Sequence, residues 1–138
     1  MTFRIIQYNL QYQKALVDLW KKCGLVVPLN DPVEDIKKKL EYQPQLLIIA
    51  VLDGRLIGSV MIGYDGHRGW LNYLAVSPEY QMRGYGRKLV QKAIDKLKEF
   101  GCLKVNVQVR INNLSAADFY RHLGFKDDEV ISLGLRLK

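Results

Sequence analysis

Residues 81–87 read Gln-Met-Arg-Gly-Tyr-Gly-Arg and lie immediately before a helical pattern. A glycine-rich turn at the start of a helix gathers free backbone N–H groups at the positive end of the helix dipole, which suits a pyrophosphate group. Gly84 and Gly86 would let the backbone approach such a ligand without interference from Cβ, and Arg83 and Arg87 add positive charge. The segment therefore predicts a pyrophosphate-binding loop, although a turn that only caps a helix has the same local pattern.

Two common phosphate-binding motifs do not explain this loop. A dinucleotide-binding fingerprint would place a third glycine at Leu89 and an acidic residue near Lys104, and neither is present. A P-loop needs Gly-Lys-Ser or Gly-Lys-Thr after four free positions that follow a glycine, and the chain has no such run. The loop therefore matches neither motif.

The elements that must position this loop follow from the spacing of apolar residues. We expect strands at residues 3–7, 46–52, 56–64, 70–77, 103–109 and 130–137, the last of which closes the sheet. Asp53-Gly54, between the second and third of these, predicts a tight hairpin turn. We expect helices over residues 12–23, from a cap at Asp31 through Leu40, from the glycine loop to Gly101, and over residues 113–123. The pattern predicts an α/β (mixed α+β) domain with one central sheet.

Three further motifs accompany the glycine loop. Leu74-Ala75-Val76-Ser77-Pro78 precedes it, Asn113 is followed seven residues later by Tyr120, and Leu123-Gly124-Phe125 comes soon after. Together they resemble the GNAT superfamily of acetyl-coenzyme A (acetyl-CoA) dependent N-acetyltransferases, over nearly the whole chain. Segments at residues 29–32, 63–69 and 132–134 are similar to the small bacterial YpeA-type branch. The resemblance implies an acyltransferase with a single domain over residues 1–138, in which about four helices flank a central, mostly antiparallel sheet.

The resemblance also implies roles for particular residues. The main chain of Leu74, Ala75 and Val76 would pair with the pantetheine arm of acetyl-CoA as an added strand does. Asn113 would touch this arm, and Tyr120 would give a proton to the departing thiolate when an amine attacks the thioester carbonyl. The backbone amides that would hold the pyrophosphate belong to Met82, Arg83, Gly84, Tyr85, Gly86 and Arg87. Acetyl-CoA is thus the implied co-substrate, with no metal.

The residues by themselves leave simpler roles open for two of these positions. Asn113 lies where a helix begins, and asparagine is a common N-cap. Tyr120 lies at helical spacing from Ala116 and Leu123, so it could equally be a core aromatic residue.

The base that would take a proton from the acceptor is not evident. Some relatives carry a glutamate, which acts as the base, at the position that matches Gln108 or Trp70. This chain has no glutamate at either position. Asp65, His67 and Glu79 remain as possible base or acceptor-site residues, although turn chemistry explains the first two as well. An α-amino group, with a pKa near ~8, is neutral at pH 7 far more often than a lysine side chain with a pKa near ~10.4. We therefore expect the acceptor to be a small-molecule amine or an exposed α-amino group.

The charge of the chain suggests an anionic partner. The net charge is +7, and residues 81–110 contain eight Lys or Arg residues against two acidic ones. Such a segment fits nucleic acid, a phosphate-bearing cofactor or a solvated helix face. No recognised motif arranges the lysines for nucleic acid, so a basic nucleic-acid-binding module is the less favoured alternative. Because the glutamates that serve as bases in relatives are missing, the second alternative is a non-catalytic sensor domain that binds acyl-CoA.

Length and composition exclude several other classes. The chain has 138 residues, of which 49% are hydrophobic, and this composition is typical of one globular domain. Its longest apolar run, residues 46–52, is far shorter than the ~20 residues that span a bilayer. Its two cysteines and two histidines show no spacing typical of a metal site or a disulfide framework. We expect a cytoplasmic monomer or homodimer that binds neither membrane nor metal.

Overall fold

The computed structural model describes residues 2–138, which fall into two compact units, residues 2–108 and 109–138. Among these residues, the first unit holds a sheet and three α-helices, and the second holds one α-helix. This content confirms the expected mixed α/β class with four helices. None of the described helices is long and apolar enough to cross a membrane.

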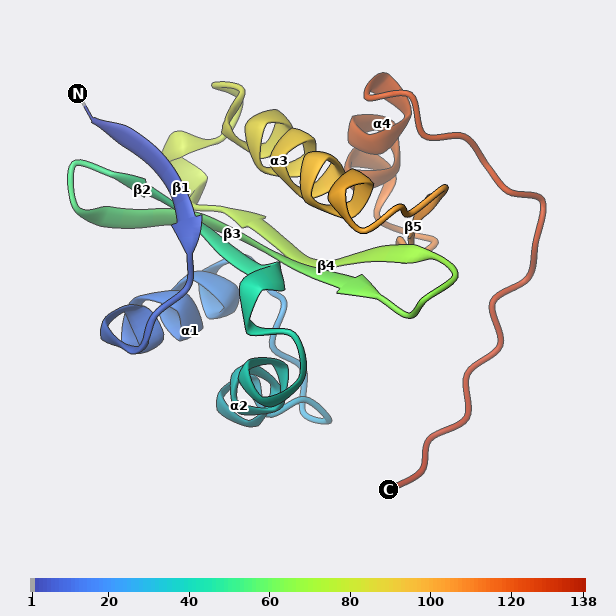
Figure 1. The fold of residues 1–138 in the computed structure, drawn as a ribbon, viewed down its shortest axis with the longest axis horizontal. Coiled ribbons are helices and arrows are strands. Elements are labelled where there is room, and N and C mark those ends of the chain that lie inside the picture. The colour runs from blue at the N-terminus through green and yellow to red at the C-terminus, as the bar shows by residue number, and fades with distance from the viewer. Residues whose placement is uncertain (1) are drawn as a thin grey trace. The chain divides into compact units, whose positions relative to one another are not determined.

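The first unit is built on a five-stranded sheet with the strand order β1-β2-β3-β4-β5 (Figure 1). Its strands are β1 (Phe3–Gln7), β2 (Leu47–Leu52), β3 (Arg55–Tyr64), β4 (Gly69–Val76) and β5 (Val105–Val107). The first four pair antiparallel in sequence order, and β5 pairs with β4 in parallel. The sheet is therefore mostly antiparallel, as expected. The strand expected at residues 103–109 is shorter, because β4 pairs with only three of its residues.

The turn between β2 and β3 has the predicted hairpin geometry. Asp53 has a φ of 50° and Gly54 a φ of 81°. Two successive left-handed residues are what a tight turn between right-twisted strands requires, and Asp-Gly adopts them at low cost. This turn fixes the register in which β2 and β3 pair.

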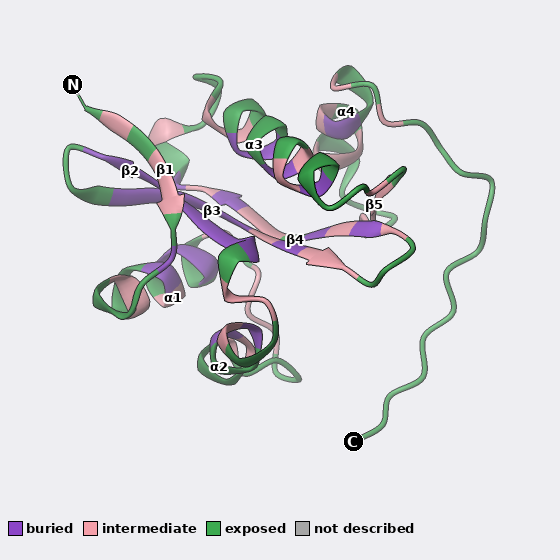
Figure 2. Ribbon diagram, viewed as in Figure 1, coloured by how far each residue is buried: buried purple, intermediate pink, exposed green. Residues whose placement is uncertain are grey.

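Helices cover both faces of the sheet. Helices α1 (Gln13–Lys22) and α2 (Pro32–Tyr42) lie on one face, and α3 (Tyr85–Glu99) lies on the other (Figure 1). Asp31 caps α2 as predicted, because its Oδ1 accepts hydrogen bonds from the backbone N–H groups of Val33 and Glu34 at 3.1 and 3.2 Å. The buried residues of the three helices face the sheet (Figure 2).

The core of the first unit lies in two layers, one on each side of β2 and β3. All six residues of β2 are buried, because helices cover both of its faces. On the α1 side, Leu16 and Trp20 are fully buried among side chains of β2. On the other side the buried face of α3 consists of Leu89, Val90, Ala93 and Leu97.

The second unit contains α4 (Leu114–His122) and a C-terminal segment without helix or strand. The strand predicted at residues 130–137 is therefore wrong. Its apolar side chains are largely exposed, from 76% at Val130 to 93% at Leu137. Alternating apolar residues make a segment suitable for a strand, but a strand exists only where a neighbour supplies ladder hydrogen bonds. Within residues 2–138 the sheet consists of β1–β5, and no strand forms a ladder with residues 130–137.

Gly58→Ala should lower the free energy of unfolding by about 1–3 kcal/mol, because the core beneath α3 is already full. A Cβ at this position would lie 2.9 Å from Leu89 Cδ1 and 3.0 Å from the backbone oxygen of Ala75. The control is Gly63→Ala on the same strand, where the nearest atom would be Trp70 Cβ at 3.8 Å. Denaturant unfolding of both variants measures the difference. Equal stabilities would contradict the tight approach of α3 to the sheet.

Candidate active site

Strand β4 extends beyond its partner β5 and leaves part of one edge without a neighbouring strand. The pairing joins Gly69, Trp70 and Leu71 to β5, and residues 72–76 continue past it. Among residues 2–138 no strand pairs with this stretch on the β5 side. The stretch includes Leu74, Ala75 and Val76, the residues predicted to pair with the pantetheine arm.

The carbonyl oxygen of one of these three residues already has hydrogen-bond partners. The Val76 carbonyl oxygen accepts a hydrogen bond from Gln81 Nε2 at 2.8 Å and another from Cys23 Sγ at 3.4 Å. A carbonyl oxygen has two lone pairs, so both are in use. The end of the open edge is thereby tied to the glycine loop through Gln81.

A β-bulge interrupts β4 at the start of the open edge. Ser59 of β3 lies opposite Ala75 and Met61 lies opposite Asn72, so Tyr73 and the residue after it share a single partner. Tyr73 has a φ of 52°, a left-handed conformation that is rare for an aromatic residue and costs about 1–3 kcal/mol. A bulge disrupts the ladder locally and bends the strand. Pairing with β3 resumes at Ala75 and Val76, so the bend lies within the open edge of β4.

Buried contacts hold the bulge in this conformation from below. Ser59 Oγ donates a hydrogen bond to the Tyr73 carbonyl oxygen at 2.8 Å and accepts one from Trp20 Nε1 at 2.9 Å. The Trp20 ring stacks on the Tyr73 ring, with 3.8 Å between centroids and 14° between planes. Ser59 and Trp20 are both fully buried, so these bonds do not compete with water.

Helix α2 and the loop before it hold the Tyr73 side chain at its other end. Its hydroxyl donates to Asp35 Oδ2 at 2.5 Å and accepts from Asn30 Nδ2 at 3.2 Å. Burial, and secondly the hydrogen bond to Asp35, raises the pKa of Tyr73 to about 12. The hydroxyl therefore stays protonated at neutral pH and remains a donor to Asp35.

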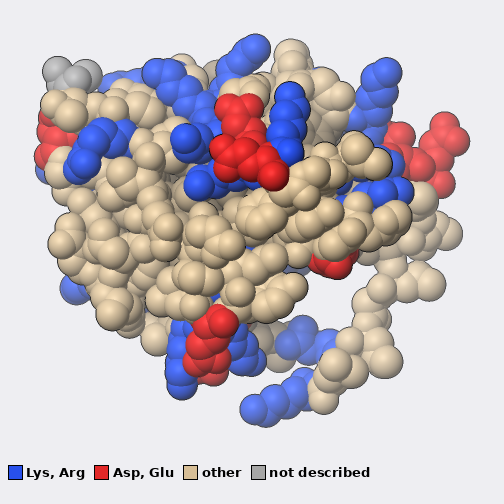
Figure 3. Space-filling model, viewed as in Figure 1, with Lys and Arg blue, Asp and Glu red and all other residues tan. Residues whose placement is uncertain are grey.

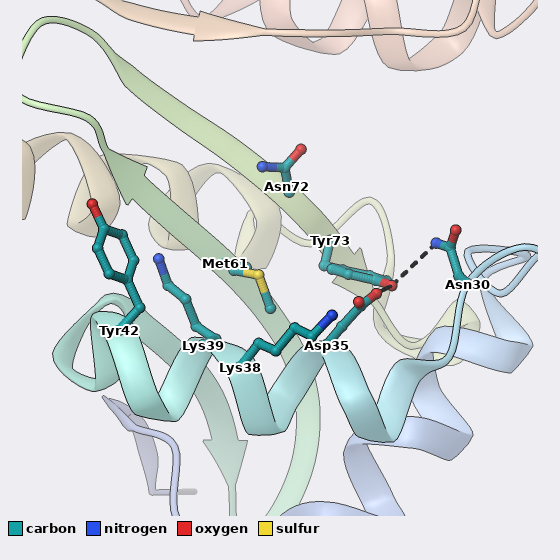
Figure 4. Close-up of a pocket in the computed structure, with 8 residues that line it drawn as sticks. All are labelled: Asn30, Asp35, Lys38, Lys39, Tyr42, Met61, Asn72 and Tyr73. Atoms are coloured by element: carbon teal, nitrogen blue, oxygen red, sulfur yellow. Dashed lines mark hydrogen bonds between the residues drawn. The ribbon is translucent and has the colours of Figure 1, made fainter. Parts of the chain in front are cut away.

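A cavity of about 420 Å³ opens beside Tyr73, between α2 and the strands β3 and β4 (Figure 4). Its walls are Asn30, Asp35, Lys38, Lys39, Tyr42, Met61, Asn72 and Tyr73. Asn72 and Tyr73 belong to the bulged part of β4, so the cavity begins where the open edge begins. The cavity is large enough for a small polar molecule.

The glycine loop leads into α3 without a side-chain cap. Gly84 is the N-cap, with a left-handed φ of 86°, and no side chain bonds to the free N–H groups of the first turn. The first turn contains no acidic residue, and a Cβ on Gly84 would meet no atom within 4 Å. Space, free donors and the positive end of the helix dipole thus coincide, which fits a pyrophosphate.

Basic side chains surround this helix end. Lys and Arg residues gather around α3 on the face shown in Figure 3, with acidic side chains between them. The Arg83 guanidinium lies 5.7 Å from the Tyr80 ring, and the Lys88 ammonium lies 5.8 Å from the Tyr85 ring. These contacts hold two cations next to the predicted pyrophosphate-binding loop.

The two predicted residues of the second unit lie at the start of α4 and on α4. Asn113 is its N-cap, as the simpler interpretation expects, and its Oδ1 accepts a hydrogen bond from the Ala116 N–H at 3.2 Å. Tyr120 is 8% exposed, and its ring packs edge-on against Phe119 and Phe125. Burial raises the pKa of Tyr120 to about 12, so its hydroxyl carries a proton at neutral pH. A cofactor contact by Asn113 and an acid role for Tyr120 stay predictions.

The residues suggested as a base lie apart from the bulge. Asp65 and His67 are in the turn between β3 and β4, at the end of β4 opposite to Leu74. Asp65 Oδ1 accepts hydrogen bonds from the N–H groups of His67 and Arg68 at 2.8 and 2.7 Å, and its Oδ2 accepts from Trp70 Nε1 at 3.3 Å. These bonds, first the one from Arg68, lower the pKa of Asp65. They stabilise its charged form and make it a weak base.

Glu79 also has a local partner. Its Oε1 accepts a hydrogen bond from Ser77 Oγ at 2.8 Å, just before the glycine loop. This contact shapes the entry to the loop, and a role for Glu79 as a base stays a prediction.

Sequence reasoning did not identify the residues of the cavity as functional. Asp35 and Tyr73 carry no motif, and they meet only because the fold brings α2 beside β4. Lys39 had a local signal. It lies at helical spacing from the core residue Ile36, and a lysine on the apolar face of a helix points away from solvent.

Comparison with known proteins defines the family. Residues 13–125 match the model of the acetyltransferase (GNAT) family. The chain is 40% identical over 137 residues to an acetyltransferase of Yersinia pestis (strain Pestoides F), covering 99% of this chain and 96% of that one. It is 42% identical over 125 residues to an acetyltransferase of Sodalis glossinidius (strain morsitans), covering 90% and 88%.

Solved structures show the same fold. The structure of AAC(6')-Iy in complex with the bisubstrate analogue CoA-S-monomethyl-acetylneamine matches with a TM-score of 0.81 at 20% identity, covering 99% of both chains. The PaiA N-acetyltransferase of Thermoplasma acidophilum in complex with coenzyme A matches with a TM-score of 0.73 at 21% identity, covering 95% of this chain and 94% of that one.

The chain belongs to the acetyltransferase (GNAT) family. It is therefore an enzyme of the acetyl-CoA-dependent N-acetyltransferase class, with acetyl-CoA as its acetyl donor. The expected class, fold and co-substrate are confirmed. The narrower likeness to the YpeA-type branch stays a prediction.

Ser59→Ala should lower the free energy of unfolding by about 1–3 kcal/mol, because it leaves the buried Trp20 Nε1–H without an acceptor and the Tyr73 carbonyl without its donor. Ser115→Ala is the control, since Ser115 is exposed. Thermal and denaturant unfolding measure the loss. A Ser59→Ala protein as stable as the Ser115→Ala protein would show that the bulge needs no support from Ser59.

Proposed function

We propose that this enzyme transfers the acetyl group of acetyl-CoA to the amine of a small molecule that enters the cavity beside Tyr73. The observation that carries the proposal is the position of the bulge. It separates the open edge of β4, where the pantetheine arm would pair, from the cavity lined by Asn72 and Tyr73. A donor on one side and an acceptor on the other would meet at this point of β4.

The glycine loop supports binding of the donor. The N–H groups at the start of α3 and the cations of Arg83 and Arg87 would hold the pyrophosphate, and the edge at Leu74 and Ala75 would hold the pantetheine arm. Two solved proteins of this fold are complexes with coenzyme A or with a coenzyme A bisubstrate analogue, which supports the same use of the fold here.

Gly84→Val should weaken coenzyme A binding by about tenfold or more, because a branched side chain would fill the space in front of the free N–H groups. Gly101→Val is a matched control. Gly101 has a φ of 80° against 86° for Gly84, both have open space around them, and Gly101 lies beyond the other end of α3. Calorimetric titration with coenzyme A compares the variants. Equal losses of affinity would attribute the effect to backbone strain and remove the loop from the binding site.

The reaction requires two proton movements. When bound, acetyl-CoA supplies an acetyl thioester. We propose that the Tyr120 hydroxyl donates its proton to the sulfur that leaves as the amine nitrogen bonds to the carbonyl carbon. Its raised pKa keeps that proton available at neutral pH. Backbone N–H groups at the bulge of β4 would stabilise the negative charge that forms on the carbonyl oxygen.

The amine must lose its own proton, and Asp35 is better situated to take part than Asp65. Asp35 lines the cavity beside Tyr73, whereas Asp65 lies at the far end of β4 with both oxygens engaged. The expected acceptors, a small amine or an exposed α-amino group, remain the proposed class. Of these two, an α-amino group needs less help from a base than a lysine side chain does.

Tyr120→Phe should lower the rate of acetyl transfer by ~10²-fold or more, with coenzyme A affinity almost unchanged, because only the proton donor is removed. Tyr64→Phe is the control, since Tyr64 packs against Phe100 in the first unit. Single-turnover release of the coenzyme A thiol measures the chemical step. An unchanged rate would make Tyr120 a core aromatic residue only.

A further inference from the structure

The cavity beside Tyr73 carries opposite charges at its two ends. Asp35 lies against Tyr73, next to the bulge of β4, whereas Lys39 extends between Tyr42 and Met61 at the other end (Figure 4). Asp35 and Lys39 are four residues apart on α2, so their Cβ atoms are about 5–6 Å apart on one helix face. A ligand in this cavity would therefore meet a carboxylate at one end and an ammonium group at the other.

Lys39 is a buried cation without a counter-ion. Its side chain is only 9% exposed, and among residues 2–138 it forms no ion pair. Its Nζ donates a hydrogen bond to the neutral Oε1 of Gln43 at 3.1 Å. Burying an uncompensated charge is unfavourable, and an anion in the cavity would relieve that cost.

The geometry around Lys39 is preorganised. Gln43 Nε2 donates to the backbone oxygen of Tyr64 at 2.9 Å, which holds the amide so that its Oε1 faces the ammonium group. The Tyr42 ring lies 6.0 Å from Lys39 Nζ. A cation held in this way loses little further side-chain entropy when it binds a ligand.

The other end of the cavity suits a cation. Asp35 Oδ2 accepts a hydrogen bond from the Tyr73 hydroxyl, and no other described side chain donates a hydrogen bond to the Asp35 carboxylate. Its carboxylate therefore has lone pairs left for an ammonium group. Because this end adjoins the bulge, an amine bound here lies nearest to the open edge of β4.

We propose that the acceptor is a short zwitterion, a small amine that also carries a carboxylate or phosphate group, and that Lys39 binds the anionic group. The inference rests on the proposed function, since it assigns the acceptor of the same site. Lys38 also lines the cavity, but its side chain is exposed and extends toward Asp35 in Figure 4, so Lys39 is the cation at the end away from the bulge. The side chain of a lysine in a folded protein carries no anionic group of its own.

The experiment compares acceptors that differ in the anionic group, at equal concentrations of the neutral amine, because the anionic group also changes the pKa of the amine. Glycine, β-alanine and 4-aminobutanoate are assayed against their carboxamides, and O-phosphoethanolamine against ethanolamine, with release of the coenzyme A thiol as the readout. The best acid should exceed its neutral partner in kcat/KM by roughly tenfold or more, the usual effect of a charge-assisted hydrogen bond. The two arms distinguish a carboxylate from a phosphate.

Three variants test the role of Lys39. Lys39→Met removes the charge from a side chain of similar length and should abolish the preference by raising KM for the acid, with kcat little changed. Lys39→Arg should restore part of it. Lys37→Met, an exposed position on the same helix outside the cavity, should leave the preference as it is. If Lys39 had a purely structural role, Lys39→Met would change kcat/KM for the acid and for its amide to the same extent.

The pH dependence gives an independent readout. Burial lowers the pKa of Lys39 to about 8, so the side chain is charged below that pH and neutral above it. The ratio of kcat/KM for the acid to that for its amide should therefore fall as the pH rises through about 8. The other ionisable groups that line the cavity are Asp35, Lys38, Tyr42 and Tyr73, and the pKa of Tyr73 is about 12.

The outcomes separate the two proposals. Equal turnover of acids and neutral amines, or a preference that survives in Lys39→Met, would overturn the zwitterion and leave the acetyltransferase function intact. If no amine is turned over, the proposed function fails. In that case, calorimetric titration of the coenzyme A complex with 4-aminobutanoate and O-phosphoethanolamine tests whether the cavity binds a zwitterion at all. Binding that disappears in Lys39→Met supports the inference, and absence of binding overturns it.

Discussion

The hydrogen bond from Ser59 Oγ to the Tyr73 carbonyl oxygen is the contact on which the candidate active site depends. Tyr73 adopts a left-handed backbone conformation that an aromatic residue avoids unless its surroundings impose it. Ser59 imposes it from β3, and Trp20 does so from α1, by bonding to Ser59 and stacking on the Tyr73 ring. The strain at one residue of β4 is therefore offset by buried contacts from two other elements, and the open edge of the strand begins there.

Helix α2 serves both the core and the cavity. Ile36 packs into the core, whereas Asp35 and Lys39, on the neighbouring part of the helix surface, line the cavity. An apolar residue in place of Lys39 would avoid the cost of burying a charge, so the lysine reduces stability in exchange for a charged wall. The Asp31 cap fixes where the helix begins, and therefore which residues face β4.

The two faces of the sheet have different electrostatic characters. On the α3 side, the helix dipole and the basic side chains together produce a positive potential suited to a phosphate-rich donor. On the α2 side, the cavity combines both signs of charge, which favours a ligand with a dipole of its own. The bulge of β4 lies where these two environments meet, because the strand is covered by α3 on one face and approached by α2 on the other.

The sequence by itself determined what depends on neighbouring residues. Asp53-Gly54 specified the hairpin turn, and Asp31 and Asn113 specified two helix starts, because each signal lies within a few positions along the chain. The glycine loop indicated the family only together with the motifs at residues 74–78, 113–120 and 123–125. The tertiary structure decided what depends on distant residues. Trp20, Ser59 and Tyr73 are separated by 39 and 14 positions, and no local pattern shows that they meet.

The same distinction explains the strand that was predicted and is absent. Residues 130–137 alternate as a strand should, but pairing requires a partner edge, and local sequence carries no information about which edge is available. Lys39 is the converse case. Its spacing from Ile36 places it on the apolar face of α2. It lines a cavity only because the fold brings β3 and β4 against that face. A cavity is formed by surfaces that come from separate parts of the chain, so no local pattern predicts it.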